Sequence, residues 1–237
     1  MTGFNRRQLL HHGLTGLAAT GVGSLTLQAS ATPTTETQDI HNYQDFLDKN
    51  GIPQVQPAGK WEPSHKDILG PYFLQGAPFR GKVTPPLEPG NLLVMRGRIW
   101  GHDTRKPVIN AVLDVWQADV QGRYDLNDPN NPPKRSDFKN RIRLVTDETG
   151  YYEYETIKPG AYRIGPSAKD FRPAHIHYLV QAPGYRKLIT QVYFQGDPLI
   201  SNDRWASKSN LVIPLMKTKS KRGSYEQGTF DIVLAKT

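Results

Sequence analysis

The chain from Trp61 onward is a series of short apolar runs, and this pattern restricts the possible folds more than any other feature. Glycine, proline and aspartate separate the runs and favour turns between them. No segment carries a long 3.6-residue apolar period, so we expect no long amphipathic helix. The sequence therefore predicts an all-β fold, an antiparallel β-sandwich with long loops and a short N-terminal arm. The expected strands are LLVMRGRIW, VINAVLDVWQAD, IRLVTD, YYEYETI, AYRIG, AHIHYLVQA, LITQVYF, SNLVIPLM and TFDIVLA.

The chain divides into three predicted segments. Residues 1–31 contain the paired arginines Arg6 and Arg7, an apolar stretch rich in Leu, Ala and Gly, and a small-x-small ending. This pattern predicts a twin-arginine-type signal peptide and export to the periplasm or the medium; an ordinary secretory signal or a flexible tail shares part of it. Residues 32–60 are interpreted as a linker or N-terminal arm, and residues 61–237 as the sandwich domain. No later run reaches the roughly 18 apolar residues of a stable membrane span.

Composition excludes several kinds of site and partner. The chain has no cysteine, which excludes disulfides, Cys-ligated zinc and iron–sulfur clusters held by its own thiolates. Any metal must therefore bind nitrogen and oxygen ligands. The net charge is +8, but the basic residues are scattered. The densest cluster, from Lys217 to Arg222, has no interleaved aromatics, so we expect a solvated loop there and no nucleic-acid partner.

Two histidines, His175 and His177, are one residue apart in the sequence RPAHIH. In a strand, side chains at i and i+2 point to the same face, about 6.5–7 Å apart along the backbone, so both can reach one metal ion. With one carboxylate the pair would suit ferrous iron, and with a third histidine zinc or copper. An isolated pair of this kind is more often a surface or core feature. The pair alone leaves the metal open.

Two tyrosines in exposed, turn-flanked settings offer further ligands. Tyr124 and Tyr162 each follow a glycine, Gly122 or Gly160, near the end of an expected strand. Each tyrosine alone would be interpreted as a core aromatic or a corner hydrogen bond. Two phenolates and two imidazoles together form a hard, anionic set that suits a trivalent first-row ion. Iron(III) is the natural candidate, because two phenolates and one hydroxide neutralise its charge.

Five motifs in a fixed order carry a family resemblance: LGPYFLQGAPFR, PVINAVLDVWQADVQGRYD, TDETGYYEYETIKPGAY, FRPAHIH and LITQVYFQGDP. Through them the sequence resembles the intradiol ring-cleaving dioxygenases, the family of catechol 1,2-dioxygenase and protocatechuate 3,4-dioxygenase, as an exported stand-alone member. The resemblance implies a non-haem Fe(III) enzyme. Such an enzyme uses O2 to cleave a catechol-type ring between its two hydroxyl-bearing carbons and gives cis,cis-muconate-type products.

The resemblance also implies roles for individual residues. Arg172 matches an arginine beside the metal that binds substrate and stabilises its negative charge, and Gln191 matches a glutamine that supports it. Pro71 and Tyr72 match one wall of the substrate pocket. Trp116 matches an aromatic packed near the metal, with a structural or a functional role. Four positions match the metal ligands: Tyr124, Tyr162, His175 and His177. The counterpart of Tyr162 in the family has a catalytic role, because it leaves the metal when substrate binds.

The sequence departs from the family at its N-terminal side. About 35 residues separate the expected cleavage site from LGPYF, too few for the helical region that catechol 1,2-dioxygenases use in dimer contacts. The oligomeric state, a homo-oligomer included, and the preferred catechol are therefore open. A second interpretation is an exported, non-catalytic binding module, because GRIWGHDTRKPVINAVLDVWQAD followed by TDETGYYEYETIKPGAY also resembles transthyretin-like sandwiches. Such a module has no need for the histidine pair together with Arg172 and both tyrosines.

Overall fold

The computed structural model describes residues 61–126, 128, 130–166, 170–221 and 223–237. The chain divides into two units, Met1–His41 and Asn42–Thr237, and every described residue belongs to the second. The predicted signal peptide and arm, residues 1–31 and 32–60, lie outside the described residues. Within these ranges, no helix combines the length and apolar character that a membrane span needs.

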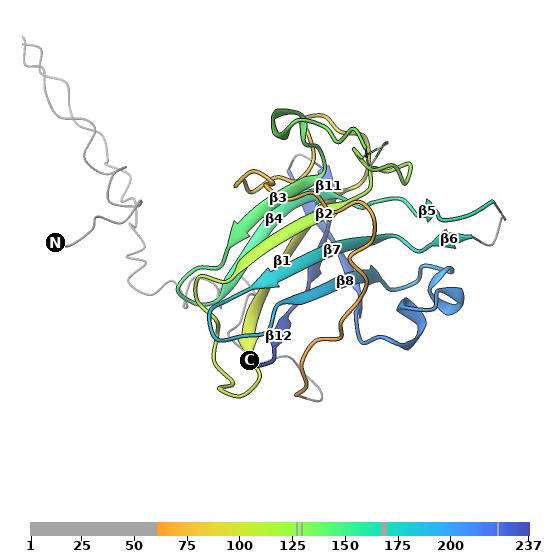
Figure 1. Cartoon of the computed structure of the whole chain (residues 1–237). Coiled ribbons are helices and arrows are strands. Elements are labelled where there is room, and N and C mark those ends of the chain that lie inside the picture. The colour runs from red at the N-terminus through yellow and green to blue at the C-terminus, as the bar shows by residue number, and fades with distance from the viewer. Residues whose placement is uncertain (1–60, 127, 129, 167–169, 222) are drawn as a thin grey trace, which may run out of the picture. The chain divides into compact units, whose positions relative to one another are not determined.

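The first of two five-stranded sheets is built around strand β1 (Leu92–Gly101) (Figure 1). On one side β1 pairs antiparallel with β4 (Tyr151–Ile157). On the other side it pairs in parallel with β11 (Gly223–Thr229) and then with β12 (Ile232–Leu234). Strand β10 (Leu215–Ser220) forms the edge beside β11. Both partners in the parallel pairings come from the C-terminal end of the chain.

The central strand of the second sheet is β7 (His175–Gln181), which begins at the first histidine of RPAHIH. The strands of this sheet, in order, are β3 (Arg141–Val145), β2 (Val112–Gln117), β7, β8 (Leu188–Phe194) and β9 (Val212–Ile213). The first four are mutually antiparallel, and β9 runs parallel to β8. Strand β7 is therefore held by hydrogen bonds along both of its edges.

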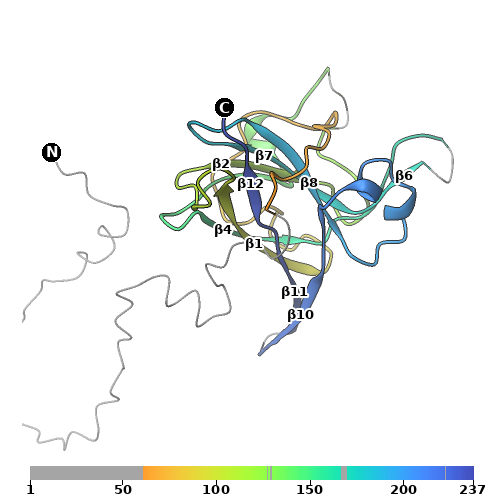
Figure 2. The same cartoon turned by 90° about the horizontal axis from the view of Figure 1, so that it is seen from below.

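A two-stranded ribbon and three 3-10 turns complete the described structure. The ribbon pairs β5 (Tyr162–Arg163) with β6 (Phe171–Arg172). The turns are η2 (Arg135–Asp137), η3 (Ile200–Asn202) and η4 (Ala206–Lys208). Figure 2 shows the turns after β8 beside β6, at the same end of the domain as the beginning of β7.

One apolar core lies between the two sheets. Leu93 and Met95 of β1 and Leu113 and Val115 of β2 belong to the same cluster of buried side chains. In each strand these residues are two apart, so they share one face and direct it toward the opposing sheet. The predicted all-β sandwich is confirmed. The parallel pairings of β1 with β11 and β12, and of β8 with β9, differ from the purely antiparallel arrangement expected.

Two local predictions were wrong in their boundaries. The run beginning at Val108 is a strand only from Val112, because Asn110 adopts a left-handed backbone with φ of 58°. The basic cluster was expected to be a loop, yet residues 217–220 belong to β10. Lys217 and Lys219 are exposed, and charged side chains are compatible with an edge strand that must not pair with other chains.

Truncation of Leu113 tests the position of the core. Leu113→Ala should lower the free energy of unfolding by about 2–5 kcal/mol, because it leaves a cavity between the sheets. The matched control is Leu87→Ala, since Leu87 is 97% exposed while Leu113 is fully buried. Urea denaturation of both variants measures the difference. Equal, small effects for the two variants would contradict this core.

Candidate metal centre

His175 and His177 lie at the start of β7 and are both buried. Their side chains share one face, as the spacing predicts, and their Nε2 atoms are 3.1 Å apart. His175 Nδ1 donates a hydrogen bond to the carbonyl oxygen of Pro173 at 2.7 Å. This contact fixes the tautomer and leaves the His175 Nε2 lone pair free to bind a metal.

The two tyrosines approach the histidines from two other segments. Tyr124 lies in the loop after β2, and its hydroxyl is 3.2 Å from His177 Nε2. Tyr162 begins β5, and its ring centroid lies 5.4 Å from that of His175 and 5.5 Å from that of Tyr124. Both tyrosines are buried rather than exposed as expected, because other parts of the fold cover these turns. The structure thus brings together all four residues that the sequence indicated.

The spacing of the His175, His177 and Tyr124 donor atoms fits a single metal ion. Two donors about 2.1 Å from one ion, seen at about 90–110°, are about 3.0–3.4 Å apart. The His175–His177 and His177–Tyr124 separations of 3.1 and 3.2 Å lie in that range. Among the described residues no three His, Cys, Asp or Glu side chains gather at a metal-binding distance. The alternatives with a carboxylate or a third histidine therefore find no third ligand in this part of the chain.

Burial sets the protonation state of the four donors. It lowers the pKa of His175 to about 3 and that of His177 well below its usual value, and the Arg172 charge acts in the same direction. Both imidazoles are therefore neutral, which is their ligating form. Burial raises the pKa of the Tyr124 and Tyr162 hydroxyls, while Arg172 lowers that of Tyr162. A bound Lewis acid is needed to favour the phenolates.

Two glycines allow the tyrosine-bearing segments to touch. A Cβ at Gly122 would lie 2.2 Å from the carbonyl oxygen of Ala161, and Gly122 has a left-handed φ of 78°. A Cβ at Gly160 would lie 2.3 Å from the carbonyl oxygen of Val120. These are the glycines that precede the two tyrosines in the sequence. Their lack of a side chain lets the Tyr124 loop pack directly on the strand that begins at Tyr162.

Aromatic rings cover two of the donors. Tyr72 stacks on Tyr124 with centroids 4.0 Å apart and meets the Tyr162 ring edge-on at 5.8 Å. Trp116 stacks on His177 with centroids 4.6 Å apart. Trp116 therefore contacts a donor ring directly, which supports a structural role in orienting that ring.

The LGPYF segment runs beside the donors, but only some of its residues contact them. A Cβ at Gly70 would lie 3.5 Å from the His177 ring, so the backbone borders this ring. Pro71 is exposed at the next position, whereas Tyr72 packs into the cluster. The structure thus places Tyr72 at the site by direct contact and Pro71 on its outer side.

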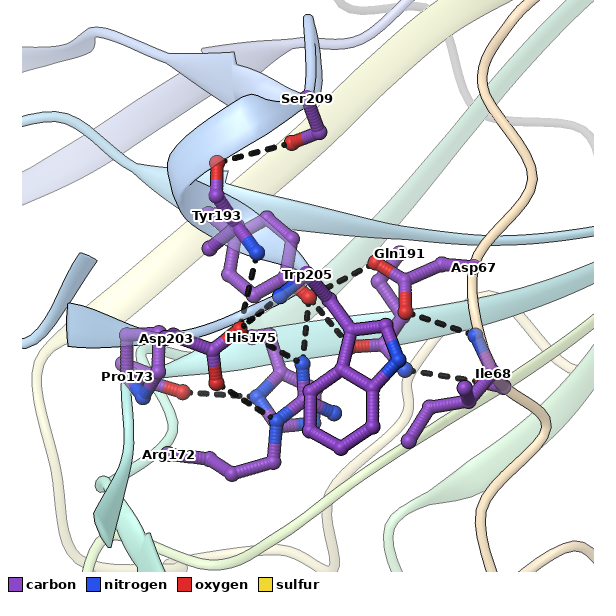
Figure 3. Close-up of polar contacts among 12 residues, drawn as sticks. Asp67, Ile68, Arg172, Pro173, His175, Gln191, Tyr193, Asp203, Trp205 and Ser209 are labelled. Atoms are coloured by element: carbon purple, nitrogen blue, oxygen red, sulfur yellow. Dashed lines mark hydrogen bonds and ion pairs between the residues drawn. The ribbon is translucent and has the colours of Figure 1, made fainter. Parts of the chain in front are cut away.

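Arg172 is a buried cation beside Tyr162, its partner in the β5–β6 register. Its Nε donates to Asp203 Oδ2 at 2.9 Å, and its Nη2 donates to the Tyr193 hydroxyl at 2.5 Å. The guanidinium also lies 4.4 Å from the centroid of the Trp205 ring (Figure 3). Its Nη1 is buried with no hydrogen-bond partner among the described residues. The guanidinium is thus held through Nε and Nη2, and the hydrogens on Nη1 are left as donors.

Gln191 faces His177 across the β7–β8 ladder. Its Nε2 donates to the carbonyl oxygen of Ile68 at 2.9 Å, and its Oε1 is 2.9 Å from the Tyr193 hydroxyl. Gln191 therefore reaches Arg172 through Tyr193 rather than by direct contact.

A buried ion pair that sequence reasoning missed anchors the Tyr124 loop. Arg141 of β3 donates from Nε to Asp125 Oδ2 at 2.9 Å and from Nη1 to the carbonyl oxygen of Tyr72 at 3.0 Å. One guanidinium thereby ties two aromatic segments of the site to the sheet. Asp125 follows Tyr124 directly in the sequence, but no local pattern links it to Arg141. Asp203, Tyr193 and Trp205 were missed for the same reason.

A groove of about 820 Å³ lies apart from these residues. Its lining includes Trp61, His65, Asn210 and Asp231, and none of the four donors. Size alone therefore does not locate the site, which is identified by its chemistry.

The close contact at Gly160 yields a test of the site's backbone. Gly160→Ala should lower the free energy of unfolding by about 1–3 kcal/mol, because the new methyl group would overlap a backbone carbonyl. Gly81→Ala is the matched control, since a Cβ there meets no heavy atom within 4 Å. Urea denaturation measures both. If Gly160→Ala is as mild as its control, the two tyrosine-bearing segments do not touch as described.

A family model described as "Dioxygenase" matches residues 68–236. The chlorocatechol 1,2-dioxygenase of Rhodococcus opacus is 36% identical over 195 residues, which cover 74% of this chain and 73% of that protein. Among solved structures, the 3-chlorocatechol 1,2-dioxygenase of Rhodococcus opacus 1CP aligns with a TM-score of 0.65 at 29% identity, covering 74% of each chain. The dioxygenase domain of a carbohydrate-binding fusion from Streptomyces sp. SirexAA-E aligns with a TM-score of 0.59 at 32% identity, covering 74% of this chain and all of that domain. The chain belongs to the intradiol ring-cleaving dioxygenase family.

Proposed function

We propose that the protein is a non-haem iron(III) dioxygenase that opens the ring of a catechol-type substrate between its two hydroxyl-bearing carbons, giving a cis,cis-muconate-type product. One observation carries the proposal, a cluster of two buried imidazoles and two buried phenols. Three of its donor atoms are 3.1 and 3.2 Å apart, and the Tyr162 ring lies 5.4 Å from that of His175. Tyr124, Tyr162, His175 and His177 would hold the metal. When bound, iron(III) supplies a Lewis acid that favours ionised catechol oxygens and draws electron density from the ring.

The donor set supports iron(III) over zinc or copper. Two neutral imidazoles and two phenols offer nitrogen and hard oxygen donors, and the chain has no thiolate. The phenols contribute two negative charges once ionised, which offsets the cost of burying a trivalent ion. A divalent ion would gain less from the second phenolate.

Tyr162 is the base that the site offers to the substrate. The Tyr162 hydroxyl has a raised pKa because it is buried, so a phenolate at this position would bind a proton strongly. The Oη atom of Tyr162 can therefore accept a proton from a catechol hydroxyl. Arg172 lowers the pKa of Tyr162 by its charge, which limits how firmly that proton is held.

Arg172 supplies a fixed positive charge for the substrate anion. Burial alone would lower the Arg172 pKa, but the hydrogen bond to Asp203 raises it above its ordinary value. Its two Nη1 hydrogens have no partner among the described residues, so they can bond to an oxygen on which charge develops. Because Asp203 and Trp205 already hold the guanidinium, little reorganisation is needed during the reaction.

Two aromatic rings shield donors of the site. Tyr72 and Trp116 lie against donor rings with interplanar angles of 7° and 8°. Their faces shield the phenol of Tyr124 and the imidazole of His177 from water, which strengthens electrostatic interactions within the site. By the family resemblance, Tyr72 and the exposed Pro71 would border the ring of a catechol-type substrate.

Family membership argues against a non-catalytic, transthyretin-like module, whose sandwich would not require these residues. A binding scaffold would bear the cost of burying Arg172 and four polar donors without using them. We also propose that residues 1–31 direct export by the twin-arginine route, on the strength of Arg6, Arg7 and the apolar stretch after them. A homo-oligomer stays a prediction of the same kind.

Replacement of Tyr124 tests the function. The purified protein should contain iron, absorb visible light through phenolate-to-iron charge transfer, and consume one O2 per catechol as muconate forms. Tyr124→Phe should remove much of the visible absorption and lower turnover by more than roughly 100-fold, beyond the 10- to 100-fold typical of residues that only support ligands. Tyr225→Phe, in β11 of the first sheet, is the control and should change neither the visible absorption nor the turnover.

Elemental analysis, visible spectra and oxygen uptake measure these effects with catechol and with carboxylated or chlorinated catechols as substrates. A colourless protein that still cleaves catechols would contradict the proposal, as would an iron-loaded protein with no ring cleavage of any of them.

A further inference from the structure

The Tyr193 hydroxyl lies among three polar partners (Figure 3). Arg172 Nη2 is 2.5 Å from it, Asp67 Oδ2 is 2.7 Å away and Gln191 Oε1 is 2.9 Å away. A phenolic hydroxyl has one hydrogen to donate, so the identity of each partner atom determines whether the group can be satisfied.

Neighbouring contacts fix which atoms face the hydroxyl. Gln191 Nε2 donates to the Ile68 carbonyl oxygen, which only accepts, so the acceptor Oε1 must point to Tyr193. Asp67 Oδ1 accepts the Ile68 backbone N–H at 2.6 Å, which leaves Oδ2 toward Tyr193. Arg172 can only donate. If Asp67 is ionised, the hydroxyl therefore faces two acceptors with one hydrogen.

A proton on Asp67 Oδ2 resolves this conflict. Asp67 then donates to the Tyr193 oxygen, and Tyr193 donates to Gln191 Oε1. Arg172 Nη2 donates to the second lone pair of the Tyr193 oxygen. All three contacts become hydrogen bonds, and Asp203 alone balances the charge of Arg172. Buried polar groups in proteins are generally satisfied in this way.

We propose that Asp67 is a positioning residue that acts in its protonated form, and that its proton orders Tyr193 and thereby holds Arg172 and Gln191 in place. Burial acts in the same direction, because it raises the Asp67 pKa against the opposing effects of the Ile68 N–H, Tyr193 and Arg172. The groups that face Asp67 are Tyr193 from β8, Arg172 from β6 and Asp203 from the loop after η3.

The two carboxyl groups near Arg172 differ in their surroundings. Asp203 accepts from Arg172 and from the backbone N–H groups of Trp205 and Ala206, and these bonds lower its pKa despite burial. Asp67 has one backbone donor and no direct contact with a guanidinium among its hydrogen bonds. The geometry therefore assigns the negative charge to Asp203 and the proton to Asp67.

The proton has a functional consequence that rests on the proposed function. Ionisation of Asp67 would add a second negative charge near Arg172 and weaken its attraction for a substrate anion. Because the folded pKa is raised, the native state binds more protons than the unfolded chain between about pH 3.9 and the folded pKa. Stability should therefore fall as the pH rises through that window and stay lower above it.

Substitution by asparagine separates protonated from ionised function. In Asp67→Asn the amide oxygen can accept from Ile68 and the amide NH2 can donate to Tyr193, as the protonated acid does. Asp67→Asn should retain the kcat that Asp67→Ala loses, with the alanine variant reduced roughly 10- to 100-fold and its KM changed less. In the wild type, ionisation of Asp67 should lower kcat as the pH rises. This fall should be absent in Asp67→Asn. Asp137→Asn, at an exposed turn, is the matched control and should behave as the wild type.

Infrared spectroscopy detects the protonated Asp67 carboxyl group without any activity assay. At about pH 6, where ordinary carboxyls are ionised, the wild type should show a protonated-carboxyl band that Asp67→Asn removes and Asp137→Asn retains. This difference also separates Asp67 from Asp231, another carboxyl whose pKa is raised by burial. If Asp67→Asn does not fold, Tyr193→Phe should shift the same band, because it removes the oxygen that the proton faces.

Absence of the band at that pH, or an asparagine variant as impaired as the alanine variant, would overturn the proposal. A band without any catechol cleavage would instead refute the proposed function and leave the protonation of Asp67 established.

Discussion

The position of β7 between β2 and β8 is the constraint on which the rest of the site depends. Its ladders place His177 opposite Trp116 on one side and opposite Gln191 on the other. The stacked ring of Trp116 and the fixed amide of Gln191 are therefore consequences of strand register. A one-residue slip would turn both histidines of β7 to the opposite face of the sheet and dismantle the donor cluster.

Two cations of the site form buried, hydrogen-bonded ion pairs. Arg172 is balanced by Asp203, and Arg141 by Asp125. Removing one member of such a pair leaves an uncompensated buried charge, which costs about 3–5 kcal/mol, so each pair is held as a unit. The first pair aims a cation at the space beside Tyr162, and the second fastens the loop that carries Tyr124. Electrostatics thus positions the parts of the site that lie outside the sheet.

Sequence predicted the features that depend on local spacing. His175 and His177 were found because two residues in one strand share a face, and the sandwich was found because its strands are short apolar runs. The proposed ligand role of Tyr124 required the family resemblance, since a lone tyrosine has many uses. Asp67 and Asp203 carry no local signal, because they come from distant loops and only the folded chain brings them to Arg172, Asp203 directly and Asp67 through Tyr193.

The convergence of four donors on one ion is the central claim, and anomalous X-ray scattering at the iron absorption edge tests it most directly. The account predicts one strong peak in a crystal of the purified protein, about 2.0–2.2 Å from the hydroxyl oxygens of Tyr124 and Tyr162 and from Nε2 of His175 and His177. A peak at another location would contradict the account. A site that binds zinc and no iron after growth with both metals would contradict it equally.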